Sequence, residues 1–538
     1  MQADVVLTGG RVVTMDPARP AATAVAVRGD RIAAVGSDAE ILASAGDGTR
    51  HVDLAGRTVI PGLIDSHTHI ELTAYSRHHW IDVRGYTVPQ ILDVVRGEAA
   101  AKPAGTWIVL QGTFGQELPD RAALDATAPD HPTAVRWSMH KFQLNGAGLD
   151  AAGITRRTIA PPGARISVDA SGEPTGLVEE GWDLLGWEPP ALDALRESIA
   201  ETARTLFMRH GVTTIHEIAA SRTGIAAYKQ LAAGPDPMPR IGLALTAAPG
   251  HQPLISVDPF SAIGLPVGFG GGKLRLSAVK IFVDGGRDGA LRSTLMGEPA
   301  HQWGLLSRAP QRLAGEVAAI LDGGAQPWIH AIGDLAQEIT VTAIEQAVRA
   351  HPGMDHRTRI EHFGNELYSD ARMHRLIAAG GIPAPNPSFV FAEPDDPARR
   401  LPPGAVKYGL RTLLSAGARP PGNSDTAGAQ PFACNPWFTM QCMLVRANRN
   451  GVVVDPDEAI TLDEALRMFT VDAARATFQE HELGSLTAGK YADLAVLNRD
   501  PYSVPADQLA TVSAELVMVG GVLTERAQLD AMARPDQP

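Results

Sequence analysis

Two histidines stand two residues apart in the stretch GLIDSHTH, which runs from Gly62 to His69. In an extended strand, residues i and i+2 point to the same face, so the imidazoles of His67 and His69 would converge on one point. Histidine is the commonest side-chain metal ligand, so this spacing is typical of a metal site. A polar strand end would show the same spacing, and the pair alone does not choose between these interpretations.

Ligand-type residues also terminate other apolar runs of the chain. Lys280 lies in LSAVKIF, His330 in WIHAI, Glu361 and His362 in RIEHF, and Asp425 at the end of GNSD. Each of them alone has an ordinary explanation, such as a capped loop, an ion pair or a helix start. That explanation would have to hold independently for all six candidate ligands, which are His67, His69, Lys280, His330, His362 and Asp425. We therefore interpret the six as one metal-binding constellation.

Eight apolar, strand-like runs alternate with helical patterns through the middle of the chain. The runs begin at Val59, Val212, Arg240, Leu276, Gln326, Arg357, Gly380 and Gly417. Helical patterns, with apolar residues three and four apart, occupy 311–324, 335–351 and 369–381. This alternation predicts an α/β fold with a TIM-like (β/α)8 barrel, although prolines in the last two runs are unwelcome in central strands. The carboxyl ends of such strands open on one face, which would bring the six candidate ligands together.

The two ends of the chain share a β-rich pattern that differs from the middle. Because unpaired terminal strands would expose their edges, we predict one small β-sandwich domain built from residues 1–58 and 476–530. The barrel would then occupy residues 59–475. About 140 residues separate the first two strand-like runs, which is more than a βα connection needs. We predict that this insertion, about 72–190, covers the barrel mouth.

Composition limits the classes of function. The chain of 538 residues has 60 Asp and Glu against 47 Lys and Arg, a net charge of −13. Nucleic acids and anionic membranes would repel such a protein, so we expect neither as a partner. The two cysteines, Cys434 and Cys442, are too few for a disulfide framework and lack zinc-knuckle spacing. With no signal peptide pattern and no membrane-spanning run, we predict a soluble, cytoplasmic protein.

Several longer strings resemble the amidohydrolase superfamily, and within it the branch of deformylase-like and N-acyl-amine hydrolases (amidohydrolase family 3). They are VIPGLIDSHTH, VKIFVDG, WIHAIGD, RIEHFGN, NSD and GSLTAGKYADLAVL. The resemblance extends over essentially the whole chain, including PDHPTAV and GEPTGLV in the expected insertion. The segment GGRDGALRST after Asp284 departs from the wording common in the family, which leaves the selectivity of that loop open.

The resemblance implies a role for each candidate metal ligand. His67 and His69 would bind one divalent metal ion, with zinc as the expected ion, and His330 and His362 would bind a second. Lys280 would carry CO₂ as a carbamate that bridges the two ions. A buried lysine amine can be neutral enough to add CO₂, and the product is an anionic oxygen ligand. Whether a chain binds one or two ions stays open.

The same resemblance implies the catalytic roles of Asp425 and His140. Asp425 would contact one metal ion, take the proton of the attacking metal-bound hydroxide and pass it to the departing nitrogen. His140, in SMHKF, matches a histidine that similar sequences place over the site. There it would hydrogen-bond the substrate carbonyl or the oxyanion, with an ordinary place in the cover as the alternative.

Other residues near these runs have two interpretations each. Glu217 would orient a metal-binding histidine or form a solvated or salt-bridged strand end. We expect His216 to be structural and Arg446 to form a salt bridge on a helix rather than to anchor substrate. Three aromatic residues would line the pocket or pack in the core and lid: Trp80, Phe142 and Trp303.

These inferences predict a metal-dependent hydrolase of a carbon–nitrogen bond in an amide, a formamide or an N-acyl amine. One alternative is a cyclic amide hydrolase or deaminase of the same superfamily. Another is a catalytically silent barrel kept for assembly or ligand binding, although a silent scaffold has no chemical need for six ligands. The expected partner is a small-molecule substrate, and a homodimer is left open.

Overall fold

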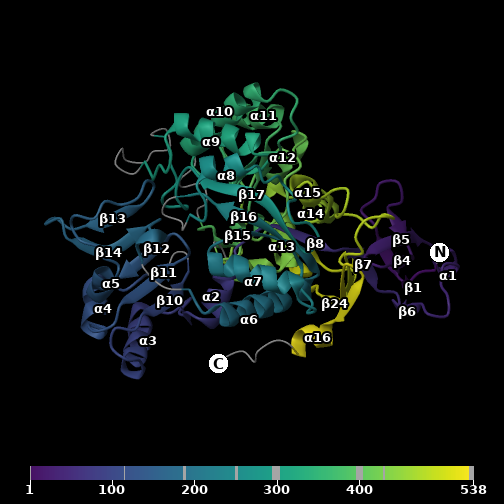
Figure 1. Ribbon diagram of the computed structural model, residues 1–538, viewed down its shortest axis with the longest axis horizontal. Coiled ribbons are helices and arrows are strands. Elements are labelled where there is room, and N and C mark those ends of the chain that lie inside the picture. The colour runs from purple at the N-terminus through teal and green to yellow at the C-terminus, as the bar shows by residue number, and fades with distance from the viewer. Residues whose placement is uncertain are drawn as a thin grey trace.

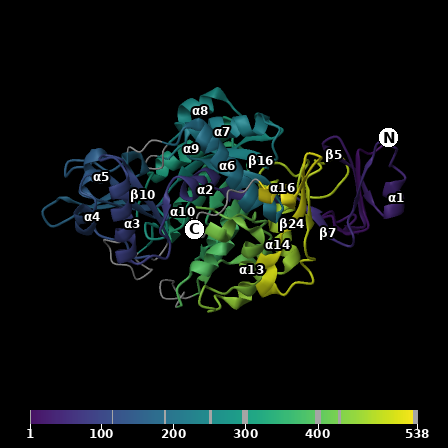
Figure 2. The same cartoon turned by 90° about the horizontal axis from the view of Figure 1, so that it is seen from below.

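A computed structural model describes residues 2–113, 116–185, 189–248, 253–293, 303–395, 404–427 and 431–531. Figures 1 and 2 show three parts along the long axis. The first strands of the chain lie at one end, a parallel sheet with its helices lies in the middle, and the strands and helices between residues 81 and 179 lie at the opposite end. Within the described ranges, no helix combines the length and apolarity that a membrane crossing requires.

The middle of the molecule is built on a seven-stranded sheet in which all neighbouring strands are parallel. In spatial order its strands are β21 (Ile382–Ala384), β19 (Arg359–Glu361), β18 (Pro327–His330), β17 (Leu274–Phe282), β16 (Arg240–Thr246), β15 (Val212–Ala219) and β8 (Leu63–Thr68). Seven of the eight expected runs therefore contribute strands to this sheet. The first run divides at Gly62, where a side chain would collide with Thr213.

The eighth expected strand, from Gly417 to Asp425, is irregular backbone instead of a strand. Two consecutive prolines in this segment, Pro420 and Pro421, cannot donate ladder hydrogen bonds, which is the physical reason for the difference. The segment still pairs with β8, because Ser66 N donates to Gly422 O (3.1 Å) and Asp425 N donates to His67 O (2.9 Å). On its other side, the Asn423 side chain donates to the carbonyl of Pro385, next to β21.

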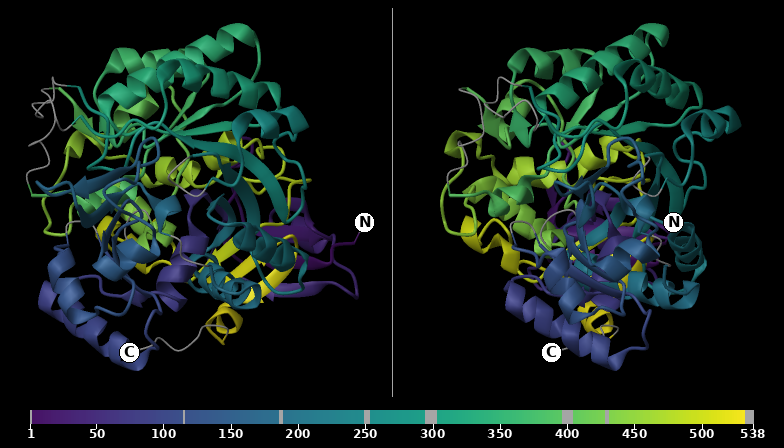
Figure 3. Two further views of the ribbon diagram at one scale, coloured as in Figure 1. Left: turned by 60° about the vertical axis from the view of Figure 1, so that its left-hand side comes forward. Right: turned by 90° about the vertical axis from the view of Figure 1, so that its left-hand side faces the viewer.

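Helices alternate with these strands and lie along the outer side of the sheet, where Figure 3 shows them in teal and green. The helices expected from periodicity are α9 (Pro310–Asp322), α10 (Asp334–Ala350) and α11 (Asp370–Ala378). In α10, the buried residues Val341, Ile344 and Ala347 recur at three-residue spacing, so one face packs inward. The remaining helices of the middle are α2 (Ile70–His78), α6 (Leu192–Thr202), α7 (Arg222–Ala233), α8 (Val257–Ile263), α12 (Leu410–Ser415), α13 (Pro436–Val445), α14 (Leu462–Met468) and α15 (Val471–Ala476).

Strands from both ends of the chain share one six-stranded sheet, in the order β25-β24-β23-β7-β2-β3. Their bounds are β2 (Arg11–Val13), β3 (Ala21–Ala22), β7 (Thr58–Pro61), β23 (Leu494–Leu497), β24 (Ala514–Val519) and β25 (Val522–Glu525). A four-stranded sheet consists of β5 (Arg31–Gly36), β4 (Ala24–Arg28), β1 (Val5–Thr8) and β6 (Arg50–Asp53). Both sheets supply side chains to one buried cluster, including Leu7 and Val27 from one sheet and Val59 and Leu494 from the other.

A second six-stranded sheet lies between α2 and α6 in the sequence, in the order β13-β14-β12-β11-β10-β9. Its strands are β9 (Ile81–Asp82), β10 (Ile108–Gly112), β11 (Thr133–Trp137), β12 (Lys141–Leu144), β13 (Arg165–Val168) and β14 (Pro174–Glu179). The helices α3 (Val88–Ala101), α4 (Arg121–Thr127) and α5 (Gly146–Ala151) accompany it. We call residues 79–185 the cover segment from here on.

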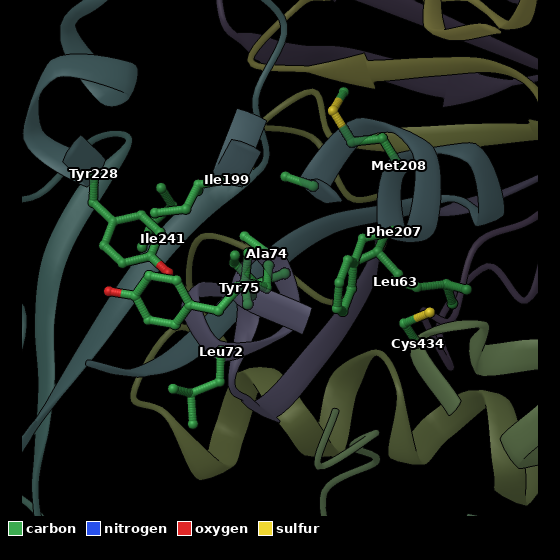
Figure 4. Close-up of a cluster of buried hydrophobic side chains, with 14 of the residues drawn as sticks. Leu63, Leu72, Ala74, Tyr75, Ile199, Phe207, Met208, Tyr228, Ile241 and Cys434 are labelled. Atoms are coloured by element: carbon green, nitrogen blue, oxygen red, sulfur yellow. The ribbon is translucent and has the colours of Figure 1, made fainter. Parts of the chain in front are cut away.

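The largest buried cluster joins the cover segment to the middle of the molecule. Figure 4 shows part of it, where Tyr75 of α2 lies among Ile199 of α6, Tyr228 of α7 and Ile241 of β16. The hydroxyl groups of the two tyrosines face each other in this view. Helix α2, which begins directly after His69, is therefore fixed by apolar packing on both α6 and α7.

Shorter elements complete the described chain. They are α1 (Asp38–Leu42), η1 (Trp182–Leu184), the π-helical turn η2 (Ala203–Phe207), η3 (Met208–His210), β20 (Glu366–Leu367), η6 (Pro387–Ala392), β22 (Val406–Lys407), η8 (Pro431–Cys434), η9 (Pro456–Glu458), η10 (Ala506–Thr511) and α16 (Arg526–Ala531).

Candidate metal centre

The six candidate ligands lie at or near the carboxyl ends of the parallel strands and are all buried. His67 lies in β8, His69 directly follows β8, Lys280 lies in β17, His330 ends β18, His362 directly follows β19, and Asp425 follows the irregular eighth segment. Their relative exposures range from 1% for His67 and Lys280 to 5% for His362. Parallel strands deliver these side chains to one edge of the sheet, as the sequence predicts.

His67, His69 and Asp425 form a compact group of three potential ligands. Asp425 Oδ1 lies 3.4 Å from His67 Nε2 and 3.3 Å from His69 Nε2. One ligand atom from each residue falls within 4.8 Å of the others. Two imidazole nitrogens and a carboxylate oxygen suit zinc and related divalent ions. Asp425 has φ of 46°, a left-handed conformation that turns its carboxylate out of the line of the segment.

His330 and His362 form a second pair beside this group. Their ring centroids are 4.4 Å apart, and the His362 ring lies 5.7 Å from the His67 ring. His362 Nδ1 is also 3.9 Å from the second carboxylate oxygen of Asp425. The two pairs of histidines therefore meet at Asp425.

Protein oxygens fix the hydrogen-bonding nitrogen in three of the four imidazoles. His67 Nδ1 donates to Glu361 Oε2 (2.5 Å), His362 Nδ1 to Asn386 Oδ1 (2.7 Å), and His330 Nε2 to the carbonyl of Gly285 (3.1 Å). A neutral imidazole that donates through one nitrogen carries its lone pair on the other. Each of these rings therefore presents one metal-binding nitrogen, which is the usual arrangement around protein-bound metals.

Burial favours the neutral form, which metal binding requires, for the imidazoles of His69, His330 and His362. Burial lowers the pKa of His69 to about 4, with Asp425 opposing this effect. Burial likewise lowers the pKa of His362 to about 3 and that of His330 well below its ordinary value. Burial would raise the pKa of Asp425, but His67, His69 and His362 outweigh it and keep this carboxyl ionised.

Lys280 presents a buried amine beside the histidines. Its Nζ lies 5.0 Å from the centre of the Phe282 ring and has no hydrogen-bond partner among the described residues. Burial lowers the pKa of Lys280 to about 8, although Glu361 and Asp425 favour its charged form. A lysine that served only as an ion-pair partner would have a carboxylate within reach, whereas this amine has none in the described structure.

Glu361 has a role that the sequence analysis did not assign. Besides the bond to His67, its two carboxylate oxygens accept hydrogen bonds from Arg359 Nε (2.8 Å) and Nη2 (2.9 Å). Burial would raise the pKa of Glu361, but Arg359 and His67 hold it well below the ordinary range. Glu361 therefore orients His67 as an ionised carboxylate. Its place next to His362 in RIEHF was the only sequence feature that pointed to it.

His140 reaches the same centre from the cover segment. Its ring centroid is 6.1 Å from that of His330, and its Nδ1 lies 3.0 Å from both carboxylate oxygens of Glu180. Glu180 also accepts a hydrogen bond from Gly286 N (2.6 Å), and a side chain at Gly286 would collide with the His140 ring. Burial lowers the pKa of His140, but Glu180 outweighs burial and raises it. Nothing in the sequence near Glu180 indicated this pairing.

Glu217 orients the backbone after His69 rather than an imidazole. Its carboxylate accepts hydrogen bonds from Ile70 N (2.6 Å), Glu71 N (3.1 Å) and the Thr68 hydroxyl (2.9 Å). These are the unpaired amides at the start of α2, where a carboxylate is favourable. Burial raises the pKa of Glu217 to about 8. The expectation of a solvated strand end is therefore wrong, and among the described residues Glu217 has neither an imidazole partner nor a salt bridge.

The two other polar candidates are structural. His216 is buried, and its Nδ1 lies 2.9 Å from the Ser277 hydroxyl. Arg446, with φ of 62°, donates to the carbonyls of Val454, Tyr408 and Lys407. The expected salt bridge of Arg446 does not occur within the described part of the chain, because backbone carbonyls saturate its guanidinium.

A hollow that is partly open to solvent adjoins His69. It is lined by His69, Leu72, Met139, Trp182, Ile218, Ala219, Ala220, Thr246 and Phe282. Of the three aromatic residues that the sequence suggested, Trp80 and Phe142 are buried behind Trp182, and Trp303 is 45% exposed. Sequence reasoning missed Trp182 and Phe282, whose ring stacks on that of His330 at 4.8 Å.

A family model described as the amidohydrolase family matches residues 50–524. The chain belongs to the amidohydrolase family. It is 29% identical to the N-substituted formamide deformylase of Arthrobacter pascens, over 97% of this chain and 98% of that protein. It is also 30% identical to Protein LONG AFTER FAR-RED 3 of Arabidopsis thaliana, over 95% of this chain and 90% of that protein.

Solved structures show the same fold. An uncharacterized metal-dependent hydrolase from Pyrococcus furiosus aligns with a TM-score of 0.70 at 22% identity, covering 92% of this chain and 99% of that chain. This amidohydrolase is a metal-dependent hydrolase that acts on carbon–nitrogen bonds, as its motifs predict.

Proposed function

We propose that this amidohydrolase cleaves the C–N bond of a small formamide, amide or N-acyl amine with water, and that the buried histidine–aspartate centre is its active site. The observation that carries the proposal is the convergence of His67, His69 and Asp425 within 4.8 Å, next to His330 and His362. A full-length deformylase relative supports the substrate class.

The residues fit a divalent metal. His67, His69 and Asp425 would hold one ion, for which zinc is our first candidate, and His330 and His362 would hold a second where two are bound. Bound there, a divalent ion supplies Lewis acidity, which acidifies water and polarises a carbonyl group. The neutral imidazoles and the ionised Asp425 match the protonation states that binding needs.

We further propose that Lys280 carries CO₂ as a carbamate. The amine nitrogen would bond to the carbon of CO₂ and lose a proton to water, which gives an anionic oxygen ligand for a metal held by the histidines. Support comes from the buried Nζ without a partner in the described structure and from a pKa of about 8, which leaves part of the amine neutral. Such neutrality is the requirement for nucleophilic addition.

Asp425 would transfer the proton, and His140 would stabilise the negative charge that develops on the substrate. Asp425 is ionised and central, so it can accept a proton from the attacking water and deliver it to the departing nitrogen. Glu180 raises the pKa of His140, and in the imidazolium form His140 would donate from Nε2 to the carbonyl oxygen as negative charge develops on it.

The proposal extends to the architecture around the site. We propose that the parallel sheet closes into the (β/α)8 barrel through the irregular eighth segment and that the two terminal sheets form a composite β-sandwich. Residues 79–185 would cover the barrel mouth. The hydrogen bonds of residues 422–425 to β8 and the shared core of the terminal sheets support this view.

The test combines metal content with a hydrolysis screen. Purified protein is analysed for metals per chain and assayed on matched formamides, acyl-amines and cyclic amides before and after chelation. We expect at least one divalent ion per chain and hydrolysis of an acyclic substrate that chelation abolishes and added metal restores. Turnover that survives complete metal removal, or action on cyclic amides alone, would contradict the proposal.

A further inference from the structure

Arg136 of β11 is a buried cation without a carboxylate partner in the described part of the chain. Its guanidinium lies 3.9 Å from the ring centre of Trp80 and 4.3 Å from that of Trp182, and its Nε and Nη1 have no hydrogen-bond partner among the described residues. Its relative exposure is 2%. An arginine remains charged in proteins, so burying it without a carboxylate is costly. The two indole faces offset part of that cost through cation–π attraction.

Trp182 is fixed on three sides. Arg136 packs on its ring, its Nε1 donates to the carbonyl of Met139 (2.6 Å), and the Phe142 ring meets it edge-on at 5.0 Å. The Trp80 ring, which directly follows α2, lies 6.2 Å from the Trp182 ring and also contacts Arg136. The guanidinium therefore contacts two neighbouring indoles, one next to α2 and one in the turn after β14.

Trp182 also forms part of the wall of the cavity next to His69. Apolar side chains dominate that wall, with Leu72, Met139, Ile218 and Phe282 beside Trp182. The hollow adjoins the metal centre, because His69 lines it and another lining residue, Phe282, stacks on His330. The hollow is partly open to solvent, so an apolar group of a substrate bound at the histidines could lie against this wall.

We propose that Trp182 is a specificity-determining residue that receives an apolar, ring-sized group of the substrate, and that Arg136 is the positioning residue that holds it in place. This inference rests on the proposed function and adds the chemical class of the substrate's side group. The carbonyl carbon would lie at the histidine centre, and the apolar group would extend from it along Leu72 toward Trp182. A planar guanidinium fixes the separation and tilt of two indoles, which a flexible aliphatic chain does not do.

The first experiment compares two formamides with similar alkylamine leaving groups, N-cyclohexylformamide and N-methylformamide. We expect Trp182→Leu to lower the ratio of their kcat/KM values about tenfold, mainly through a higher KM for the cyclohexyl compound. Trp182→Phe, which keeps an aromatic wall, is expected to retain most of the ratio. An unchanged ratio in folded Trp182→Leu, checked by its melting temperature, would overturn the role of Trp182.

The second experiment separates positioning from stability. Arg136→Met keeps an unbranched apolar chain and removes the charged, planar guanidinium, whereas Arg136→Lys keeps a cation. We expect Arg136→Met to lower the substrate ratio severalfold and Arg136→Lys to restore part of it. Arg96→Met, an exposed arginine of α3 in the same cover segment, is the control and should leave the ratio unchanged. A lower melting temperature in Arg136→Met with an unchanged ratio would make Arg136 merely structural and overturn its positioning role.

A binding measurement distinguishes failure of this inference from failure of the proposed function. The probe is 4-fluorobenzamide, an aromatic amide observed by ¹⁹F NMR with the metal-loaded protein. If the wild type broadens the ¹⁹F line and Trp182→Leu broadens it much less, the subsite is supported even when neither formamide is hydrolysed. The lack of hydrolysis would then count against the proposed activity alone. Equal broadening by both proteins, or none by the wild type, overturns the subsite.

Discussion

The ends of the parallel strands and the cover segment contribute to the same site in different ways. The strand ends supply His67, His330 and His362, whose ring orientations are fixed by a carboxylate, a carbonyl and an amide oxygen. The cover segment supplies His140 from a loop between antiparallel strands and Trp182 from a short helical turn. On the proposed function, the strand ends would supply the metal ligands and Asp425, whereas the cover segment would contribute His140 to the reaction and Trp182 to the choice of substrate.

The largest effect is expected at Lys280, deep in the strand-end group. Lys280→Ala should lose nearly all activity and bind fewer metal ions per chain, because it removes the proposed anionic ligand between the two positions. Small carboxylic acids should restore some activity by placing a carboxylate in the vacated space. Metals per chain and kcat are measured for Lys280→Ala, Lys280→Arg and the exposed control Lys229→Ala. Full metal content with substantial turnover in either Lys280 variant would show that Lys280 is no bridge.

Asp425→Asn should separate metal binding from proton transfer. The amide keeps an oxygen for the metal but accepts no proton at neutral pH, so we expect kcat to fall about 10²- to 10⁴-fold with metals retained. The exposed Asp322→Asn serves as the matched control. A kcat near that of the wild type would remove Asp425 from the mechanism and weaken the assignment of chemistry to the strand ends.

Glu361→Gln should weaken metal binding without removing a ligand. The amide still accepts one hydrogen bond from His67 but loses the charge that raises the basicity of the ring, and it meets Arg359 less favourably. We expect metal affinity to fall about 10- to 100-fold, with activity recovered at high metal concentration. Chelator competition measures the affinity, and Glu345→Gln, which removes an ion pair with Arg375, is the control. An unchanged affinity would mean that His67 needs no orienting carboxylate.

How much of the structure the sequence predicts also differs between the two regions. Seven strand runs and the convergence of the six candidate ligands follow from periodicity and from the rule that parallel strands end on one face. The prediction of an eighth strand was wrong. The order of the runs places this segment beside β8 and β21, but Pro420 and Pro421 prevent the ladder hydrogen bonds of a strand. Glu361 is next to the candidate ligand His362 in the sequence, but spacing along a strand does not show that its carboxylate accepts a hydrogen bond from the ring of His67.

In the cover segment, the partners come from distant positions. Glu180 meets His140 across 40 residues, and Trp182 meets Arg136 through the packing of β11 on the turn after β14. No periodicity encodes such pairs, because they depend on the register of antiparallel strands and on loops. Trp80 and Phe142 were the better candidates by sequence, but they lie one layer behind the cavity wall.

The smallest expected effect concerns the link between the two regions, where Glu180 tunes His140. Glu180 favours the imidazolium form, so the pKa of His140 is raised, and an Nε2 proton persists to higher pH in the wild type. If this proton binds the carbonyl oxygen, activity falls as pH rises through that pKa. Glu180→Gln removes the anion, so the pKa of His140 falls and the alkaline limb of kcat/KM should move to lower pH. On the acid side of the shifted limb the rate should change little. Glu179→Gln, whose parent carboxylate pairs with Arg165 rather than His140, should leave the limb in place. An alkaline limb that stays fixed in Glu180→Gln would assign it to a group of the strand ends and reduce His140 to a packing residue of the cover segment.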